Sequence, residues 1–144
     1  IYRPLNNKMV NSIMEPLRKK YICKKQIKKG ISGVRESLKF FKQGTSIAIM
    51  IDQRVSEGEK INFFSRPALT TTLPAQLSIK YNIPIVPVFI KREKKDKFKI
   101  KFYSPFYSSQ FKDKFELTNK LNLELQNMII KNPKQWIWTH DRWK

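Results

Sequence analysis

The polar triplet Asp52, Gln53 and Arg54 ends an unbroken apolar run in the stretch SIAIMIDQR. A carboxylate and a guanidinium are costly to bury without partners, so we expect them where a strand ends at the edge of a ligand site. Lys91 and Arg92 follow a second apolar run, IPIVPVFI, in the same way. Grouped cations favour a phosphorylated ligand, because guanidinium groups bind phosphate oxygens in bidentate fashion. The alternative, in which Asp52 caps a turn and the arginines are only solvated, stays open.

The remaining reactive side chains predict no catalytic or metal centre. The single histidine, His140, lies in the aromatic stretch WIWTHDRWK, where no orienting partner can be assigned, so we interpret it as part of a packed tail. Cys23 is the single cysteine, which excludes an internal disulfide and makes a zinc site very unfavourable. No Gly-rich phosphate loop occurs. We therefore predict neither a metal nor a cofactor.

Helical periodicity identifies three helices that would position the polar groups. Apolar residues recur at helical spacing over residues 31–41, from about 68 to 81, and over 117–129. Because Pro74 is tolerated only in a first turn, the second helix is expected to start near Thr72. The threonines of ALTTTLPAQ could hold an anion at this helix start, although capping by one of them is the preferred interpretation.

The strand pattern predicts an α/β fold with a mixed, mainly parallel sheet flanked by helices. The apolar runs 47–51 and 83–90 are typical of strands buried on both faces, and the second contains prolines that suit a sheet edge. A helix between two strands indicates a βαβ unit, whose parallel strands would bring Asp52 and Arg92 to one edge. The strictly alternating stretch KFKIKFY predicts a half-exposed strand antiparallel to its neighbour.

The charge of the chain defines a class of partner. The 144 residues include Lys+Arg 30 and Asp+Glu 11, for a formal net charge of +19. Such a surface attracts nucleic acid, anionic lipid headgroups or phosphorylated substrates. A basic nucleic-acid-binding module is the main alternative function, but no aromatic RNA-binding strand, Gly loop or helix-turn-helix pattern occurs. The chain opens on Ile1 without a leader, and we expect it to be the C-terminal piece of a longer protein.

The order of segments resembles that of the bacterial lipid A biosynthesis (lauroyl/myristoyl) acyltransferases, within the lysophospholipid acyltransferase superfamily. The segments that carry the resemblance are YRPLNN, a later Arg18, GVRESLKFFKQG, IAIMIDQR, INFFSRPALTTT, IPIVPVFIKR and NPKQWIWTHDRWK. Each segment is weak evidence, but seven in order over residues 2–144 are specific. The resemblance implies a glycerolipid acyltransferase-like fold.

The resemblance also implies a reaction and a location. The family transfers a fatty acyl chain from acyl carrier protein to a hydroxyl of a phosphorylated lipid A precursor, at the cytoplasmic face of the bacterial inner membrane. Its catalytic motif, His-x-x-x-x-Asp/Glu, is absent from this sequence and is expected upstream of Ile1. We therefore expect residues 1–144 to be the C-terminal part of a single acyltransferase domain, inactive alone. An anionic membrane surface is an expected partner and nucleic acid is not. A noncatalytic lipid-surface adaptor remains another alternative.

Several residues match the family's substrate-binding segments. Arg3, Asn6 and Arg18 match a segment with phosphate-binding basic groups, and Asp52 matches a strand-end block beside the acceptor. We expect Arg18 or Arg54 to be the partner of Asp52. The complete predicted substrate-binding set is Arg3, Asn6, Arg18, Asp52, Gln53, Arg54, Phe63, Phe64, Thr71 and Arg92.

One position departs from the family pattern. Ser65 stands where the family usually has Gly after the paired phenylalanines. Because Gly is the residue that turns with positive φ favour, the substitution predicts an altered turn at this point.

Overall fold

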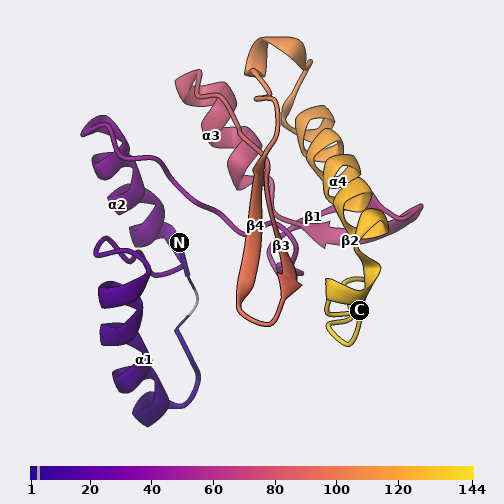
Figure 1. Ribbon diagram of the computed structural model, residues 1–144. Coiled ribbons are helices and arrows are strands. Elements are labelled where there is room, and N and C mark those ends of the chain that lie inside the picture. Colours follow the sequence, from indigo (N-terminus) through magenta and orange to yellow (C-terminus); the bar gives the residue numbers. More distant parts are fainter. Residues whose placement is uncertain (3) are drawn as a thin grey trace. The chain divides into compact units, whose positions relative to one another are not determined.

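The computed structural model describes residues 1–2 and 4–144, which form two compact units, Ile1–Met50 and Ile51–Lys144 (Figure 1). Each unit is described by itself. The expectation that all 144 residues belong to one acyltransferase domain remains a prediction.

The first unit contains two helices. Helix α1, Lys8–Tyr21, begins at Asn7, whose side chain accepts hydrogen bonds from two backbone N–H groups of the first turn. Helix α2, Ile31–Lys42, confirms the helix predicted over residues 31–41. Gly44 follows it with a φ of +77°, a conformation that favours glycine, so this helix ends where the sequence indicated.

The strands of the second unit form two antiparallel hairpins. Strand β1, Glu59–Phe63, pairs with β2, Arg66–Thr70. Strand β3, Val88–Lys94, pairs with β4, Lys97–Phe102, which confirms the predicted antiparallel partner of the KFKIKFY stretch. Each hairpin is a separate sheet of two strands.

Two helices and two short 3-10 turns complete the second unit. Helix α3, Leu73–Tyr81, begins after Thr72 with Pro74 in its first turn, as predicted. Helix α4, Lys114–Lys131, confirms the predicted C-terminal helix, and the residues after it form the 3-10 turn η2, Pro133–Gln135. The other 3-10 turn, η1, is Ser108–Gln110.

The mainly parallel sheet was a wrong prediction, although the mixed α/β composition is correct. Both described sheets are antiparallel, and residues 47–51 pair with no strand in the part of the chain that the structure describes. Their side chains alternate between half-buried and exposed, and Met50 is largely exposed. An apolar run reveals that a segment needs cover, but it does not identify the strand that supplies it.

The second predicted strand, residues 83–90, is also different from the expectation. Its first half makes only an isolated antiparallel bridge between Ile85 and Phe106, and regular pairing starts at Val88. Pro84 and Pro87 explain the late start, because proline has no N–H to donate to a ladder. The segment is partly exposed rather than buried on both faces.

The core of the second unit consists of two apolar clusters on opposite parts of α4. One joins Phe63 and Ala68 of the first hairpin to Ile129. The other joins Ala75 of α3 to Leu117 and Leu121. Helix α4 therefore packs on both β1 and α3 (Figure 1).

Candidate functional site

Arg142 is the central residue of the candidate site, and the sequence did not point to it. Its side chain is 0% exposed. The guanidinium donates through Nη1 to the backbone oxygen of Gln53 and through Nη2 to Thr70 Oγ1, at 3.2 Å. It also lies 4.9 Å from the centroid of the Phe63 ring, a cation–π contact. The tail thus places the Arg142 guanidinium next to the backbone of Gln53.

Asp52 is the acidic residue that interacts with this cation. Burial lowers the pKa of the Arg142 guanidinium, and the negative charge of Asp52 opposes the shift. Asp52 is half-buried, and its Oδ1 has no hydrogen-bond partner among the described residues. A buried carboxylate oxygen without a donor is costly. It can accept a hydrogen bond from a hydroxyl group of a ligand.

His140 also contacts the polar triplet. Its Nε2 accepts a hydrogen bond of 3.3 Å from the backbone N–H of Arg54. His140 is exposed, and this hydrogen bond connects the tail to Arg54. This contact agrees with the structural role inferred for His140 from the sequence.

Asn122 extends the polar cluster to helix α4. Its amide Nδ2 donates to the backbone oxygen of Asn62 at 3.0 Å and to Thr70 Oγ1 at 3.4 Å. Thr70 therefore accepts from both Asn122 and Arg142. These bonds join the first hairpin, α4 and the tail around one buried hydroxyl, so the geometry at Gln53 depends on all three.

The paired phenylalanines belong to the framework of this cluster. Phe63 is fully buried, and its backbone oxygen accepts a hydrogen bond of 2.9 Å from Trp143 Nε1. Phe64 is partly buried and meets Phe63 edge-on, with ring centroids 4.9 Å apart. The two rings and Trp143 form the apolar wall on which Arg142 is packed.

Thr71 and Arg92 have local contacts outside this cluster. Thr71 Oγ1 accepts from the backbone N–H of Leu73 at 3.3 Å, so it caps the start of α3, the preferred one of the two sequence interpretations. The Arg92 guanidinium lies 5.0 Å from the Phe98 ring centroid, and its backbone exchanges two hydrogen bonds with the Gln135 side chain. The predicted meeting of Asp52 and Arg92 at one edge depended on parallel strands, which the structure does not contain.

The other predicted residues lie in the first unit. Asn6 is exposed just before α1. Arg18 is half-buried, with its guanidinium 5.1 Å from the Tyr2 ring centroid, and its Nη1 has no hydrogen-bond partner among the described residues. Such a nitrogen can donate to an anion. Arg3 lies outside the described residues.

For the partner of Asp52 we predicted Arg18 or Arg54. Within the second unit, the charge of Arg142 interacts with that of Asp52, and Arg54 contributes its backbone N–H to the tail contact. The assignment of Arg18, which lies in the other unit, stays a prediction. In the sequence, Arg142 lies in the tail stretch THDRWK, directly before a tryptophan. Long-range burial of this arginine depends on tertiary packing, so neighbouring residues did not reveal it.

Among the described residues, no group of three or more His, Cys, Asp or Glu side chains could hold a metal ion. None of the described helices is long and apolar enough to cross a bilayer.

The fold and the site define a basic protein of mixed α/β composition. Its tail buries the guanidinium of Arg142, which interacts with the charge of Asp52. The family model described as bacterial lipid A biosynthesis acyltransferase matches residues 1–144, which is the whole chain. The chain therefore belongs to the bacterial lipid A biosynthesis acyltransferase family. Among curated proteins, none matches it significantly.

Proposed function

We propose that this chain is the acceptor-binding and scaffold part of an O-acyltransferase that moves a fatty acyl chain from acyl carrier protein to a hydroxyl of a lipid A precursor. The reaction takes place at the cytoplasmic face of the bacterial inner membrane. The family match over residues 1–144 carries this proposal, because lipid A biosynthesis by acyl transfer requires an acyl donor and a lipid acceptor.

The polar cluster supports a role in acceptor binding. Asp52 Oδ1 is a buried acceptor without a donor, and Arg142 holds the adjoining backbone at Gln53. In this proposal the Asp52 carboxylate accepts a hydrogen bond from the acceptor sugar, and Arg54 binds a phosphate with its exposed side chain. In the first unit, the guanidinium Nη1 of Arg18, which has no hydrogen-bond partner among the described residues, donates to a phosphate oxygen.

The catalytic base is not supplied by this chain in our proposal. His140 is the single histidine, and its Nε2 is engaged by the backbone N–H of Arg54. A base must deprotonate the attacking hydroxyl, and an orienting carboxylate must hold that base. A His-x-x-x-x-Asp/Glu segment of the full-length protein takes this role, so residues 1–144 alone are inactive.

A donor and acceptor assay tests the proposal. The full-length protein is incubated with a radiolabelled acyl group, either on acyl carrier protein or on coenzyme A, together with a lipid A precursor that has a free hydroxyl. We expect acyl transfer from acyl carrier protein, and none from residues 1–144 alone. Transfer from coenzyme A only would overturn the donor assignment. Transfer by residues 1–144 would overturn the assignment of the base, and absence of any transfer by the full-length protein would overturn the proposed reaction.

A further inference from the structure

Helix α1 has an apolar face that its own unit leaves uncovered. Met9 is 74% exposed, Ile13 60% and Tyr21 71%, and Leu17 between them is also exposed. These residues recur every four positions and therefore lie along one side of the helix. No residue of α1 is buried. An amphipathic helix in a globular protein normally buries this side.

The opposite, polar face of α1 makes the contacts with the rest of the unit. Glu15 forms an ion pair with Lys28 beyond the helix at 4.0 Å, in addition to its pair with Lys19 of the same helix at 3.4 Å. Arg18 lies over the Tyr2 ring. The usual arrangement is thus inverted, because the polar side faces its own unit and the apolar side is left for another partner.

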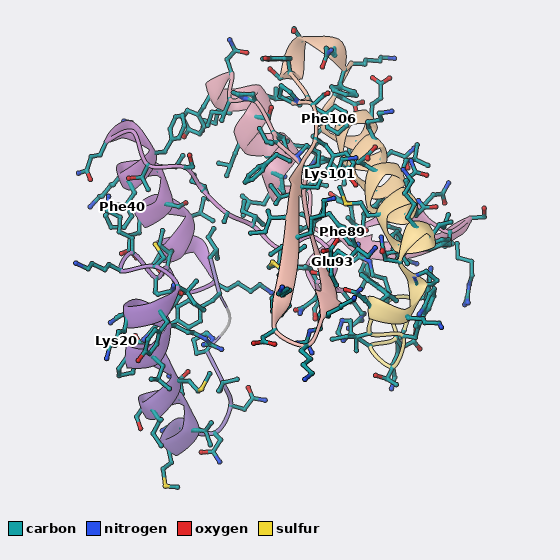
Figure 2. The ribbon with its side chains drawn as sticks, in the orientation of Figure 1. Lys20, Phe40, Phe89, Glu93, Lys101 and Phe106 are labelled. Carbon is teal, nitrogen blue, oxygen red and sulfur yellow. The ribbon has the colours of Figure 1, made fainter. Side chains whose placement is uncertain are left out.

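The charge around this apolar face indicates what the partner is. The last turn of α1 contains Arg18, Lys19 and Lys20, and Figure 2 shows Lys20 on this turn. Four more lysines follow before Gly30, and Glu15 is the single acidic residue between Lys8 and Gly30 in the sequence. An apolar stripe beside a cluster of Lys and Arg is typical of helices that lie in the interface of an anionic bilayer.

The length of α1 limits how this helix can lie in a bilayer. Helix α1 has 14 residues. At about 1.5 Å per residue it is about 21 Å long, which is less than the ~30 Å needed to cross the hydrocarbon core. It can therefore lie in the membrane plane but cannot span the bilayer.

We propose that α1 docks this protein on an anionic phospholipid bilayer, with Met9, Ile13, Leu17 and Tyr21 inserted at the boundary between headgroups and acyl chains. Lys20, which lies on the same side of the helix as this stripe, contacts the anionic headgroups in this arrangement. The inference deepens the proposed function and rests on it for the choice of a lipid partner. It adds the element that makes the contact.

Vesicle binding by the full chain tests this docking surface. Co-sedimentation is measured with vesicles of phosphatidylcholine alone and with vesicles that contain phosphatidylglycerol and phosphatidylcholine in equal parts. We expect binding to the anionic vesicles, and we expect Ile13→Glu with Leu17→Glu to weaken it by at least roughly tenfold. The matched control is Ile130→Glu, an equally exposed apolar residue on α4, which should bind like the unchanged chain.

A second pair of variants separates the charge contribution. Lys20→Gln should weaken binding to the anionic vesicles, whereas Lys131→Gln on α4 should have a smaller effect. If the glutamate pair lowers the helix content measured by circular dichroism, Met9→Ser with Tyr21→Ser replaces it, since both side chains are more than 70% exposed. Unchanged vesicle binding by the apolar variants would overturn the proposal.

Two further outcomes would assign the apolar face to another occupant. A second copy of the chain would be indicated if the unchanged chain were dimeric without vesicles and the glutamate pair made it monomeric. The remainder of the protein would be indicated if the pair lowered the melting temperature without changing vesicle binding. Either result overturns the docking proposal. Acyl transfer by the full-length protein to a detergent-dispersed acceptor is measured in parallel, so failure of docking is distinguished from failure of the proposed reaction.

Discussion

The Arg142 guanidinium donates a hydrogen bond to the backbone oxygen of Gln53, which lies 89 residues earlier in the chain. The same guanidinium interacts with the charge of Asp52 and donates to Thr70 Oγ1. The buried guanidinium of Arg142 thus links the tail to Asp52 and Gln53 and to Thr70 of the first hairpin. The shape of the candidate site depends on this residue, although it was not part of the predicted substrate-binding set.

Replacement of Arg142 by alanine should destabilise the fold. The change leaves the buried backbone oxygen of Gln53 and the Thr70 hydroxyl without this donor, and loss of a buried hydrogen bond to a charged group costs about 1.5–3 kcal/mol. The measurement is the free energy of unfolding in urea. Arg54→Ala is the control, since that side chain is exposed, and it should change stability by less than about 0.5 kcal/mol. Equal stability of the two variants would contradict the structural role of Arg142.

Replacement of Ser65 by glycine should stabilise the fold. Phe64 and Ser65 form the turn between β1 and β2 with φ of +50° and +58°, and positive φ at both positions is the type I′ pattern that favours glycine at the second one. Relief of the left-handed strain is expected to add roughly 1 kcal/mol to the free energy of unfolding. The positive φ of Ser65 suits glycine, the residue that the resemblance implies here, and an altered turn relative to the family stays a prediction.

Ser104→Gly is the control for this prediction, because Ser104 is exposed and is not among the residues with positive φ. There glycine adds only flexibility to the unfolded chain and should give no stabilisation. A loss of stability in Ser65→Gly would show that the serine side chain supports the turn.

The substitution Asp52→Asn tests the acceptor-binding role in the full-length enzyme. The change is nearly isosteric but removes the charge beside Arg142, so we expect activity to fall tenfold or more, or about 1.4 kcal/mol in the barrier. The melting temperature should show that the fold remains, because asparagine also suits a strand end or a turn. Asp96→Asn in the exposed turn between β3 and β4 is the control. Unchanged activity of Asp52→Asn would leave Asp52 as a turn residue.

The first unit should lose stability in acid through Glu15. Desolvation raises the pKa of Glu15, but Lys28, Lys19 and Tyr2 together lower it below its ordinary value. A carboxyl whose folded pKa is lowered stabilises the fold above its unfolded pKa of about 4.3. That contribution is lost as the pH falls through the lower, folded pKa.

Helix content followed by circular dichroism in an acid titration measures this effect. Glu15→Gln should reduce the stability near neutral pH and flatten its dependence on pH below about 4.3, since the variant has no carboxyl to protonate. Glu36→Gln on α2, where the glutamate is exposed, serves as the control. An acid transition that is the same in Glu15→Gln and the unchanged chain would contradict the prediction.

Helices α2, α3 and α4 could be predicted from the sequence because their signals are local, whereas α1 was not predicted. Helical spacing identified α2 and α4, and Pro74 fixed the start of α3 at Thr72. The alternation of KFKIKFY predicted β4 and its antiparallel partner. The order of segments also indicated the family, which the match over residues 1–144 confirms.

The pairing of the strands and the burial of the Arg142 guanidinium depend on the tertiary structure. The apolar run 47–51 indicated a need for cover, but which strand pairs with which depends on contacts between distant residues. The strand expected before residue 52 does not form in the described part of the chain. Asp52, Gln53 and Arg54 were recognised as a polar group at the end of an apolar run because that pattern is local. Their partner Arg142 was not, since its burial depends on Phe63, Thr70 and Trp143 packing around the tail, and no pattern in neighbouring residues encodes such a contact.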